Sequence, residues 1–123
     1  MSSDETQKAA LLISGDLFFS SKITGTAEQL GLRVDVEGNA EQACQRAAAS
    51  HYRCLLLDLA MPNLAVANVM ASLPGENRPR VIAFGSHVNT VRLEEARAAG
   101  CDEVMARSRF SQTLPELLKQ CLG

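Results

Sequence analysis

An uninterrupted apolar run that ends in a single carboxylate constrains the fold of this chain most. Residues 54–57 read Cys-Leu-Leu-Leu, and Asp58 follows directly. A strand that is apolar on both faces is typical of a parallel sheet covered by helices on each side. Because burying an unpaired carboxylate costs free energy, we expect Asp58 at the C-terminal end of that strand, the edge where open α/β sheets bind ligands. Pro62 then interrupts regular structure.

The rest of the chain alternates between short apolar runs and longer segments with helical periodicity. Gly31 and Gly100 suit the ends of helices, Asn39 and Asn89 suit their beginnings, and residues 113–116 read as a capping box. Such alternation with short connections predicts one doubly wound α/β domain, a five-stranded parallel sheet flanked by five helices. Strands are predicted over 9–13, 33–36, 54–57, 80–84 and 103–106, and helices over 17–30, 40–50, 65–73, 90–99 and 114–122.

Length and composition narrow the class of protein. The 123 residues, 46% of them hydrophobic and 21% charged, suffice for one domain, which we place at 8–123 after a polar tail at 1–7. No apolar run approaches the roughly 18 residues of a membrane span, and the polar tail does not resemble a secretory signal. We therefore expect a cytoplasmic protein without a membrane partner. A net charge of −2 and 4% aromatic residues also argue against nucleic acid as a partner.

The cysteines and histidines form no recognisable ligand pattern. They lie far apart, without a C-x-x-C pair, so neither a zinc site nor a disulfide framework is expected in a cytosolic chain. We interpret the cysteines as small buried hydrophobes. The residues concerned are Cys44, Cys54, Cys101, Cys121, His51 and His87.

Three segments of the sequence resemble the receiver domain of bacterial two-component response regulators. Asp58-x-x-Met61-Pro62 follows the third of five strands, as the phosphoacceptor motif does in that family. Residues 11–16 resemble the family's first strand with its acidic pair, and residues 98–108 resemble the stretch that ends in its lysine and proline. The resemblance covers nearly the whole chain. It implies a flavodoxin-like, receiver-type fold and a role in phosphorelay signalling rather than in enzyme catalysis.

The resemblance also implies roles for individual residues. In that family a kinase phosphohistidine passes its phosphoryl group to an aspartate, and Mg²⁺ bridges the acidic residues and the phosphate. Asp58 matches the phosphoacceptor, and Asp16 matches the member of the acidic pair that usually ligates the metal. The backbone carbonyl of Ala60 is the third implied metal ligand. Arg107 stands at the lysine position, where it keeps the positive charge but differs in reach and shape.

Several family features are missing. Gly15 stands where the second acid belongs, Val104 replaces the aromatic switch residue, and Ser108 replaces the proline. The hydroxyl position falls on Gly85 or, if the loop is shifted by one residue, on Ser86. Losing one acid lowers metal affinity by about 10–100-fold, so we expect Mg²⁺ to bind weakly or not at all. The lost hydroxyl and ring remove contacts through which a phosphate shifts such a domain between two states.

Two functions remain open at this point. In the first, Asp58 is a phosphoacceptor in an incomplete pocket that Arg107 and Ser86 complete, served by a histidine kinase or a phosphotransfer protein. In the second, the chain is a phosphorylation-independent interaction module, a pseudo-receiver that binds a downstream signalling protein. A homodimer is open in either case. The less specific interpretations are that Asp58 is a turn residue and that Asp16 merely caps a helix.

Two further segments invite a functional interpretation. Residues 107–110, Arg-Ser-Arg-Phe, form a small basic patch, which we interpret as a solvated loop and the first candidate for a partner contact. Ser86 and His87 suggest a Ser–His pair, but adjacent residues rarely aim at each other and no third, orienting acid is evident. A small flavodoxin-like enzyme is thus the weakest alternative.

Overall fold

Strands and helices alternate along the chain as the sequence predicts. The computed structural model describes residues 9–49 and 51–123. The five strands are all parallel, in the order β2-β1-β3-β4-β5, which is a doubly wound sheet. The elements are β1 (Ala9–Ile13), α2 (Leu17–Gln29), β2 (Arg33–Glu37), α3 (Ala40–Ala49), β3 (Cys54–Asp58), α4 (Val66–Ser72), β4 (Arg80–Gly85), α5 (Thr90–Ala98), β5 (Glu103–Ala106), α6 (Arg107–Gln112) and α7 (Leu114–Leu122).

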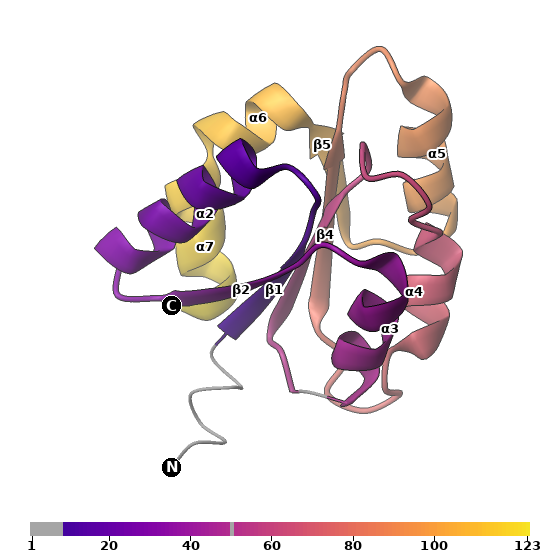
Figure 1. Ribbon diagram of the computed structural model, residues 1–123, viewed down its shortest axis with the longest axis horizontal. Coiled ribbons are helices and arrows are strands. Elements are labelled where there is room, and N and C mark those ends of the chain that lie inside the picture. Colours follow the sequence, from indigo (N-terminus) through magenta and orange to yellow (C-terminus); the bar gives the residue numbers. More distant parts are fainter. Residues whose placement is uncertain (1–8, 50) are drawn as a thin grey trace.

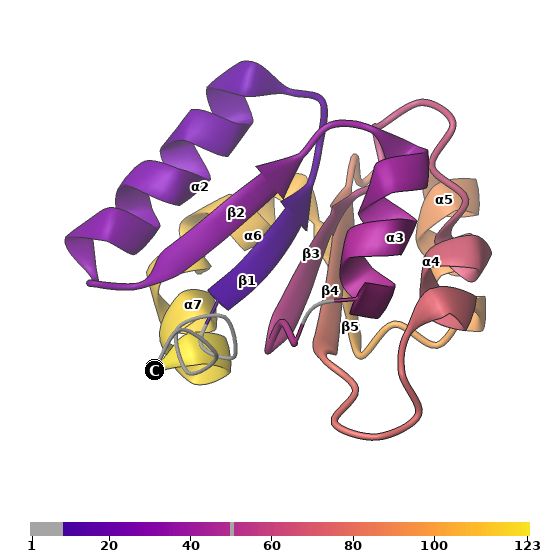
Figure 2. The same cartoon turned by 60° about the horizontal axis from the view of Figure 1, so that its bottom comes forward.

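The sheet lies between two layers of helices. Helices α3, α4 and α5 cover one face, and α2, α6 and α7 cover the other (Figures 1 and 2). Alternate residues of each strand supply two separate cores: Leu55 and Leu57 face the first helix layer, whereas Leu56 faces the second. The central strands are buried on both sides, which explains their unbroken apolar runs. Among the described residues no helix combines the length and the apolar composition that crossing a membrane requires.

Local signals predict most boundaries to within one or two residues. Asn89 Oδ1 accepts a hydrogen bond from the Arg92 amide at the start of α5, and Asn39 does the same for α3. Gly31 and Gly100 follow the ends of α2 and α5 with φ of 72° and 95°, a conformation that favours glycine. The 1–7 tail lies outside the described residues, and the domain limits remain a prediction.

Two predictions fail near the C-terminus. Residues 107–110 form the first turn of a sixth helix, α6, instead of a solvated loop. Thr113 makes no capping box, because its hydroxyl donates back to the Arg109 carbonyl at 2.8 Å. The reason lies in Phe110, which is fully buried and stacks on Phe84 with ring centroids 4.2 Å apart. Burying that ring requires a turn of helix directly after β5, and only Ser108 and Arg109 of the patch are exposed.

Replacing Phe110 with alanine is expected to lower the free energy of unfolding by about 3–5 kcal/mol, because a stacked, fully buried ring is lost. Urea unfolding measures the change. Phe18→Ala is the matched control: Phe18 is 92% exposed, so its loss should change stability by less than about 0.5 kcal/mol. Equal effects of the two substitutions would contradict this account of α6.

Candidate functional site

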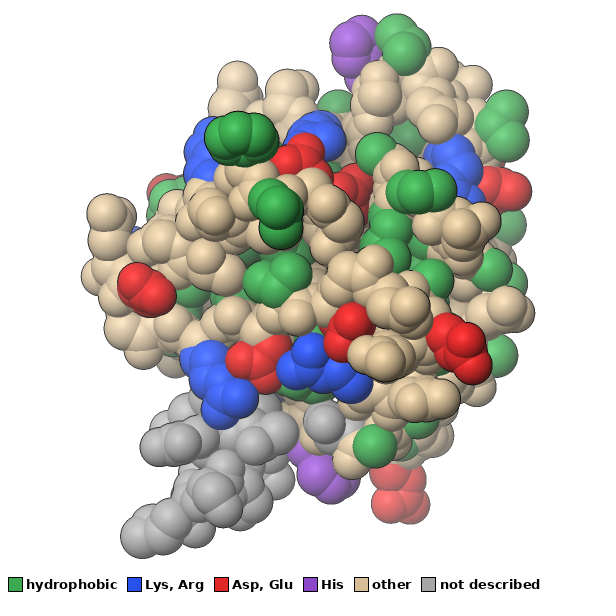
Figure 3. Space-filling view, in the orientation of Figure 1, with side chains coloured by type: hydrophobic (Ala, Val, Ile, Leu, Met, Phe, Trp, Pro, Cys, Tyr) green, Lys and Arg blue, Asp and Glu red, His purple; other side chains and the backbone are tan. Residues whose placement is uncertain are grey.

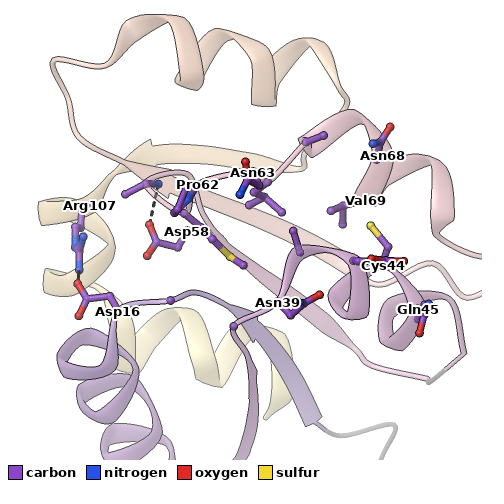
Figure 4. A pocket seen from close by; sticks show the side chains of 18 residues that line it. Asp16, Asn39, Cys44, Gln45, Asp58, Pro62, Asn63, Asn68, Val69 and Arg107 are labelled. Atoms are coloured by element: carbon purple, nitrogen blue, oxygen red, sulfur yellow. Dashed lines mark hydrogen bonds and ion pairs between the residues drawn. The ribbon is translucent and has the colours of Figure 1, made fainter.

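A groove of about 1010 Å³ opens at the C-terminal edge of the sheet, where the loops after β1 and β3 meet the first turn of α3. Four predicted site residues line it: Asp16, Asp58, Ala60 and Arg107. Figure 4 shows Asp16 and Arg107 facing each other at one end, with Asp58 beside them. From there the groove extends between α3 and α4 as far as Cys44. Parallel strands place their C-terminal ends at one edge, which is why residues so far apart in sequence converge here.

Asp58 is held by two hydrogen bonds at the end of β3. The hydroxyl of Ser14 donates to its Oδ2 at 2.7 Å, and the backbone amide of Ala60 donates to its Oδ1 at 3.0 Å. The Asp58 residue is only 2% exposed. Both carboxylate oxygens therefore have a donor within the protein, as a buried carboxylate requires.

Ser14 connects Asp58 to the start of α2. Its oxygen accepts the backbone N–H of Asp16 at 3.1 Å while its hydroxyl hydrogen goes to Asp58. Ser14 directly follows Ile13, which pairs with Leu57, so the sheet register places it beside Asp58. The sequence analysis does not single out Ser14, because a serine after an apolar strand is an ordinary turn residue.

Asp16 has two partners on the same side of the groove. Its Oδ1 accepts the backbone N–H of Phe19 at 3.0 Å, which caps α2, and its Oδ2 accepts Nη2 of Arg107 at 2.6 Å. These bonds, the backbone bond to Phe19 first and Arg107 second, lower the pKa of Asp16 below its ordinary value of 3.8. The cap that the sequence predicts is thus present together with a long-range ion pair.

Arg107 is fixed from a second direction. Its guanidinium carbon lies 4.1 Å from the centroid of the Phe19 ring, a cation–π contact. Phe19 in turn packs against Phe84 and Phe110, with centroids 5.3 and 6.0 Å away. Arg107 therefore joins α6 to α2, and its charge is directed at Asp16 rather than at Asp58 (Figure 4).

The hydroxyl position of the family motif has no hydroxyl in this groove. Gly85 is the last residue of β4 and pairs with Ala106, the residue before Arg107. A Cβ atom at Gly85 would lie 3.1 Å from the Cβ of Leu59. Leu59 thus fills the space that a larger side chain at Gly85 would need. Ser86 is exposed, does not line the groove, and accepts the Val88 amide within its own turn at 3.4 Å. Its predicted role in phosphate binding has no contact in support.

The residues present fit a magnesium ion poorly. Mg²⁺ requires hard oxygen ligands, and the carboxylates of Asp58 and Asp16 are the acids in this groove near Ala60. Asp16 is paired with Arg107, a cation that competes with the metal, and Gly15 has no side chain. Within residues 9–49 and 51–123, no three His, Cys, Asp or Glu side chains gather closely enough to hold a metal. The metal roles of Asp16, Asp58 and Ala60 remain predictions.

Arg92 is a positioning residue that the sequence does not reveal. From α5 its Nε donates to the carbonyl of Leu59 at 3.1 Å, and its Nη2 donates to the carbonyl of Leu64 at 3.0 Å. Both carbonyls flank the loop that carries Ala60 and Pro62. No local sequence pattern identifies such a residue, since an arginine in a helix is commonly an ordinary surface residue.

Asp16→Asn should remove the charge of the Arg107 ion pair while keeping a capping side chain. Because the folded-state pKa of Asp16 is lowered, its carboxylate stabilises the fold above pH 3.8 and loses this effect as the pH falls through the lowered pKa. The difference in unfolding free energy between wild type and variant should be largest near neutral pH and vanish in strong acid. Urea unfolding across a pH series measures it, and a pH-independent difference would contradict the ion pair.

Ser14→Ala is expected to lower the free energy of unfolding by about 1–3 kcal/mol, because one oxygen of a buried carboxylate loses its donor. The control is Ser111→Ala, because the Ser111 hydroxyl accepts an exposed hydrogen bond from Lys22 and serves no buried carboxylate. In an Asp58→Ala background the Ser14→Ala effect should shrink, since the acceptor is gone. An undiminished effect in that double variant would show that Ser14 acts independently of Asp58.

Comparison with solved structures identifies the fold. No protein-family model matches this sequence, and no curated protein matches it either. A response regulator receiver domain from Bermanella marisrubri superposes with a TM-score of 0.78 at 20% identity, over 94% of this chain and 98% of that one. A response regulator from Hahella chejuensis gives 0.79 at 18% identity, over 93% and 94%.

A third similar structure is the receiver domain of a sensor histidine kinase from Pseudomonas aeruginosa, solved with magnesium coordinated in its active site cleft. It gives a TM-score of 0.78 at 21% identity, over 94% of this chain and 97% of that one. The predicted architecture is therefore confirmed: the chain has the flavodoxin-like fold of response regulator receiver domains.

Proposed function

We propose that this chain is a receiver-like signalling domain that works through protein contacts and does not require phosphorylation of Asp58. The hydrogen-bonded burial of Asp58 is the observation that carries this proposal. An acceptor carboxylate has to meet a phosphodonor, yet this one is 2% exposed and both its oxygens accept hydrogen bonds inside the protein.

The surroundings of Asp58 support the same proposal. The cation at the family's lysine position, Arg107, is bound to Asp16 at 2.6 Å and to the Phe19 ring. Leu59 fills the space beside Gly85, where the family carries a hydroxyl. Val104 on β5 has no ring to rotate. Phosphoryl transfer to a carboxylate depends on positive charge and on hydrogen-bond donors directed at the phosphate. The residues around Asp58 supply few such groups.

Exposed apolar side chains near the same edge of the sheet favour a protein partner. Leu17 and Phe18, which follow Asp16, are 81% and 92% exposed, and Val88 and Val91, which follow β4, are 75% and 69% exposed. Figure 3 shows apolar side chains at the surface over the first turn of α2. Contiguous apolar surface is typical of interaction sites, and Leu17 and Phe18 are adjacent at the start of α2. The partner would be a histidine kinase, a phosphotransfer protein or a downstream signalling protein. A non-enzymatic role, a cytoplasmic location and a homodimer remain predictions.

A second candidate function keeps Asp58 as a phosphoacceptor. Its position favours this, because Asp58 ends β3 at the floor of a groove that also holds Asp16 and Arg107. One similar receiver domain coordinates magnesium in its cleft. In this chain, acceptance of a phosphoryl group would require Ser14 and the Ala60 amide to release or share the carboxylate, and Arg107 to leave Asp16.

Incubation with acetyl phosphate and Mg²⁺ separates the two functions. We expect no phosphoryl adduct on the wild-type protein by intact-mass measurement, and no resonance shifts around Asp58 with beryllofluoride. An adduct that is absent from the Asp58→Asn variant would overturn the first proposal in favour of the second. Gly15→Asp serves as the matched control, because a Cβ on Gly15 meets no atom within 4 Å and the new acid restores a metal ligand. That variant should bind Mg²⁺ more tightly than the wild type.

A further inference from the structure

Each of the four carboxylate oxygens of Asp16 and Asp58 already accepts a hydrogen bond from the protein. Three of these donors are neutral, and the fourth is the guanidinium of Arg107, whose Nη2 lies 2.6 Å from Oδ2 of Asp16. Among the lining residues of the groove that the structure describes, Arg107 is the one basic side chain. We propose that Arg107 is an internal counter-ion that takes the place of a divalent metal in this groove and withholds Asp16 from such an ion.

The charge of Arg107 matches the acids that this end of the groove contains. Asp58 is buried and has two neutral donors, whereas the side chain of Asp16 is 37% exposed and has the cation as a partner. A guanidinium brings one positive charge, which balances Asp16, and Gly15 beside it adds no second acid. Mg²⁺ brings two charges and requires oxygen ligands that it can take from their present partners. One acid with one internal cation is therefore a complete arrangement without a metal.

Arg107 is held in this role by the helix that Asp16 caps. Its guanidinium carbon lies 4.1 Å from the ring centroid of Phe19, three positions after Asp16. Both contacts of the guanidinium thus go to the start of α2. A planar guanidinium can donate to a carboxylate and stack on an aromatic ring, which an ammonium group does less well. A metal that took Asp16 would have to displace the guanidinium from the carboxylate, against its contact with the ring.

The pairing of Arg107 also deepens the proposed function. A groove whose cation is already engaged lacks the positive charge that transfer of a phosphoryl group to Asp58 needs. This consequence rests on the proposed function, but the affinity for a metal is measured without any phosphodonor. Either proposal can therefore fail while the other stands.

Four proteins test the competition between Arg107 and a metal: the wild type, Arg107→Gln, Gly15→Asp and the double variant. Calorimetry with Mg²⁺ measures each affinity, and line broadening by Mn²⁺ locates the ion. We expect no saturable binding of millimolar Mg²⁺ to the wild type. In the Gly15→Asp background, Arg107→Gln should raise the affinity by about tenfold or more, because Asp16 is released. Mn²⁺ should then broaden the amide resonances of Asp16 and Ala60, and adding Asp16→Asn should abolish the gain.

Arg109→Gln is the matched control. It removes the same charge two positions further along α6, from an exposed side chain that does not line the groove. In the Gly15→Asp background it should change the affinity for Mg²⁺ by less than about twofold, because solvent and salt screen its charge. Arg107→Lys keeps a cation at position 107 and should bind Mg²⁺ less tightly than Arg107→Gln. Circular dichroism checks that each variant folds.

Displacement can also be followed with Arg107 in place. In Gly15→Asp, saturation with Mg²⁺ should shift the Nε–H resonance of Arg107, because the guanidinium leaves Asp16. Several outcomes would overturn the proposal: equal affinities with and without Arg107, an equal gain from Arg109→Gln, or an unmoved Nε–H resonance. Saturable binding of Mg²⁺ in the groove of the wild type, or no binding by the double variant, would overturn it as well.

Discussion

A carboxylate buried at the end of an apolar strand has to find hydrogen-bond donors within the protein, and the arrangement of this edge of the sheet follows from that requirement. Asp58 finds its donors in Ser14 and in the amide of Ala60. The first depends on the register of β1 against β3, in which Ile13 lies opposite Leu57. The second depends on the turn after β3, whose carbonyls Arg92 holds. A shift in either would leave a buried charge without a partner.

The same edge carries a second interaction, between Asp16 and Arg107, that joins the first helix to the sixth. Arg107 also covers Phe19, and Phe19 packs on the aromatic rings of β4 and α6. The cation that a phosphoryl group would require is therefore part of the packing. Arg107 thus contributes to the packing of this edge without any phosphoryl group. Fold and chemistry are separable, because one fold can carry different groups at the same edge of its sheet.

The two ends of the sheet thus differ in chemistry. The C-terminal end presents an acid, an ion pair and exposed apolar side chains at Leu17, Phe18, Val88 and Val91, which suit recognition of a protein. At the N-terminal end, by contrast, Cys54 and Cys121 are buried in the core between the sheet and the layer of α2, α6 and α7.

Periodicity and capping residues suffice to predict the five strands, five of the helices and the position of Asp58 at a sheet edge, because each of these depends on neighbours a few residues away. The partners of Asp58 and Asp16 escape such analysis, since Ser14 lies 44 positions from Asp58 and Arg107 lies 91 positions from Asp16. Only the folded chain shows that Phe110 must be buried, which turns an expected loop into α6. Local sequence determines where elements form, whereas side-chain contacts between distant segments decide what the groups at the sheet edges can do.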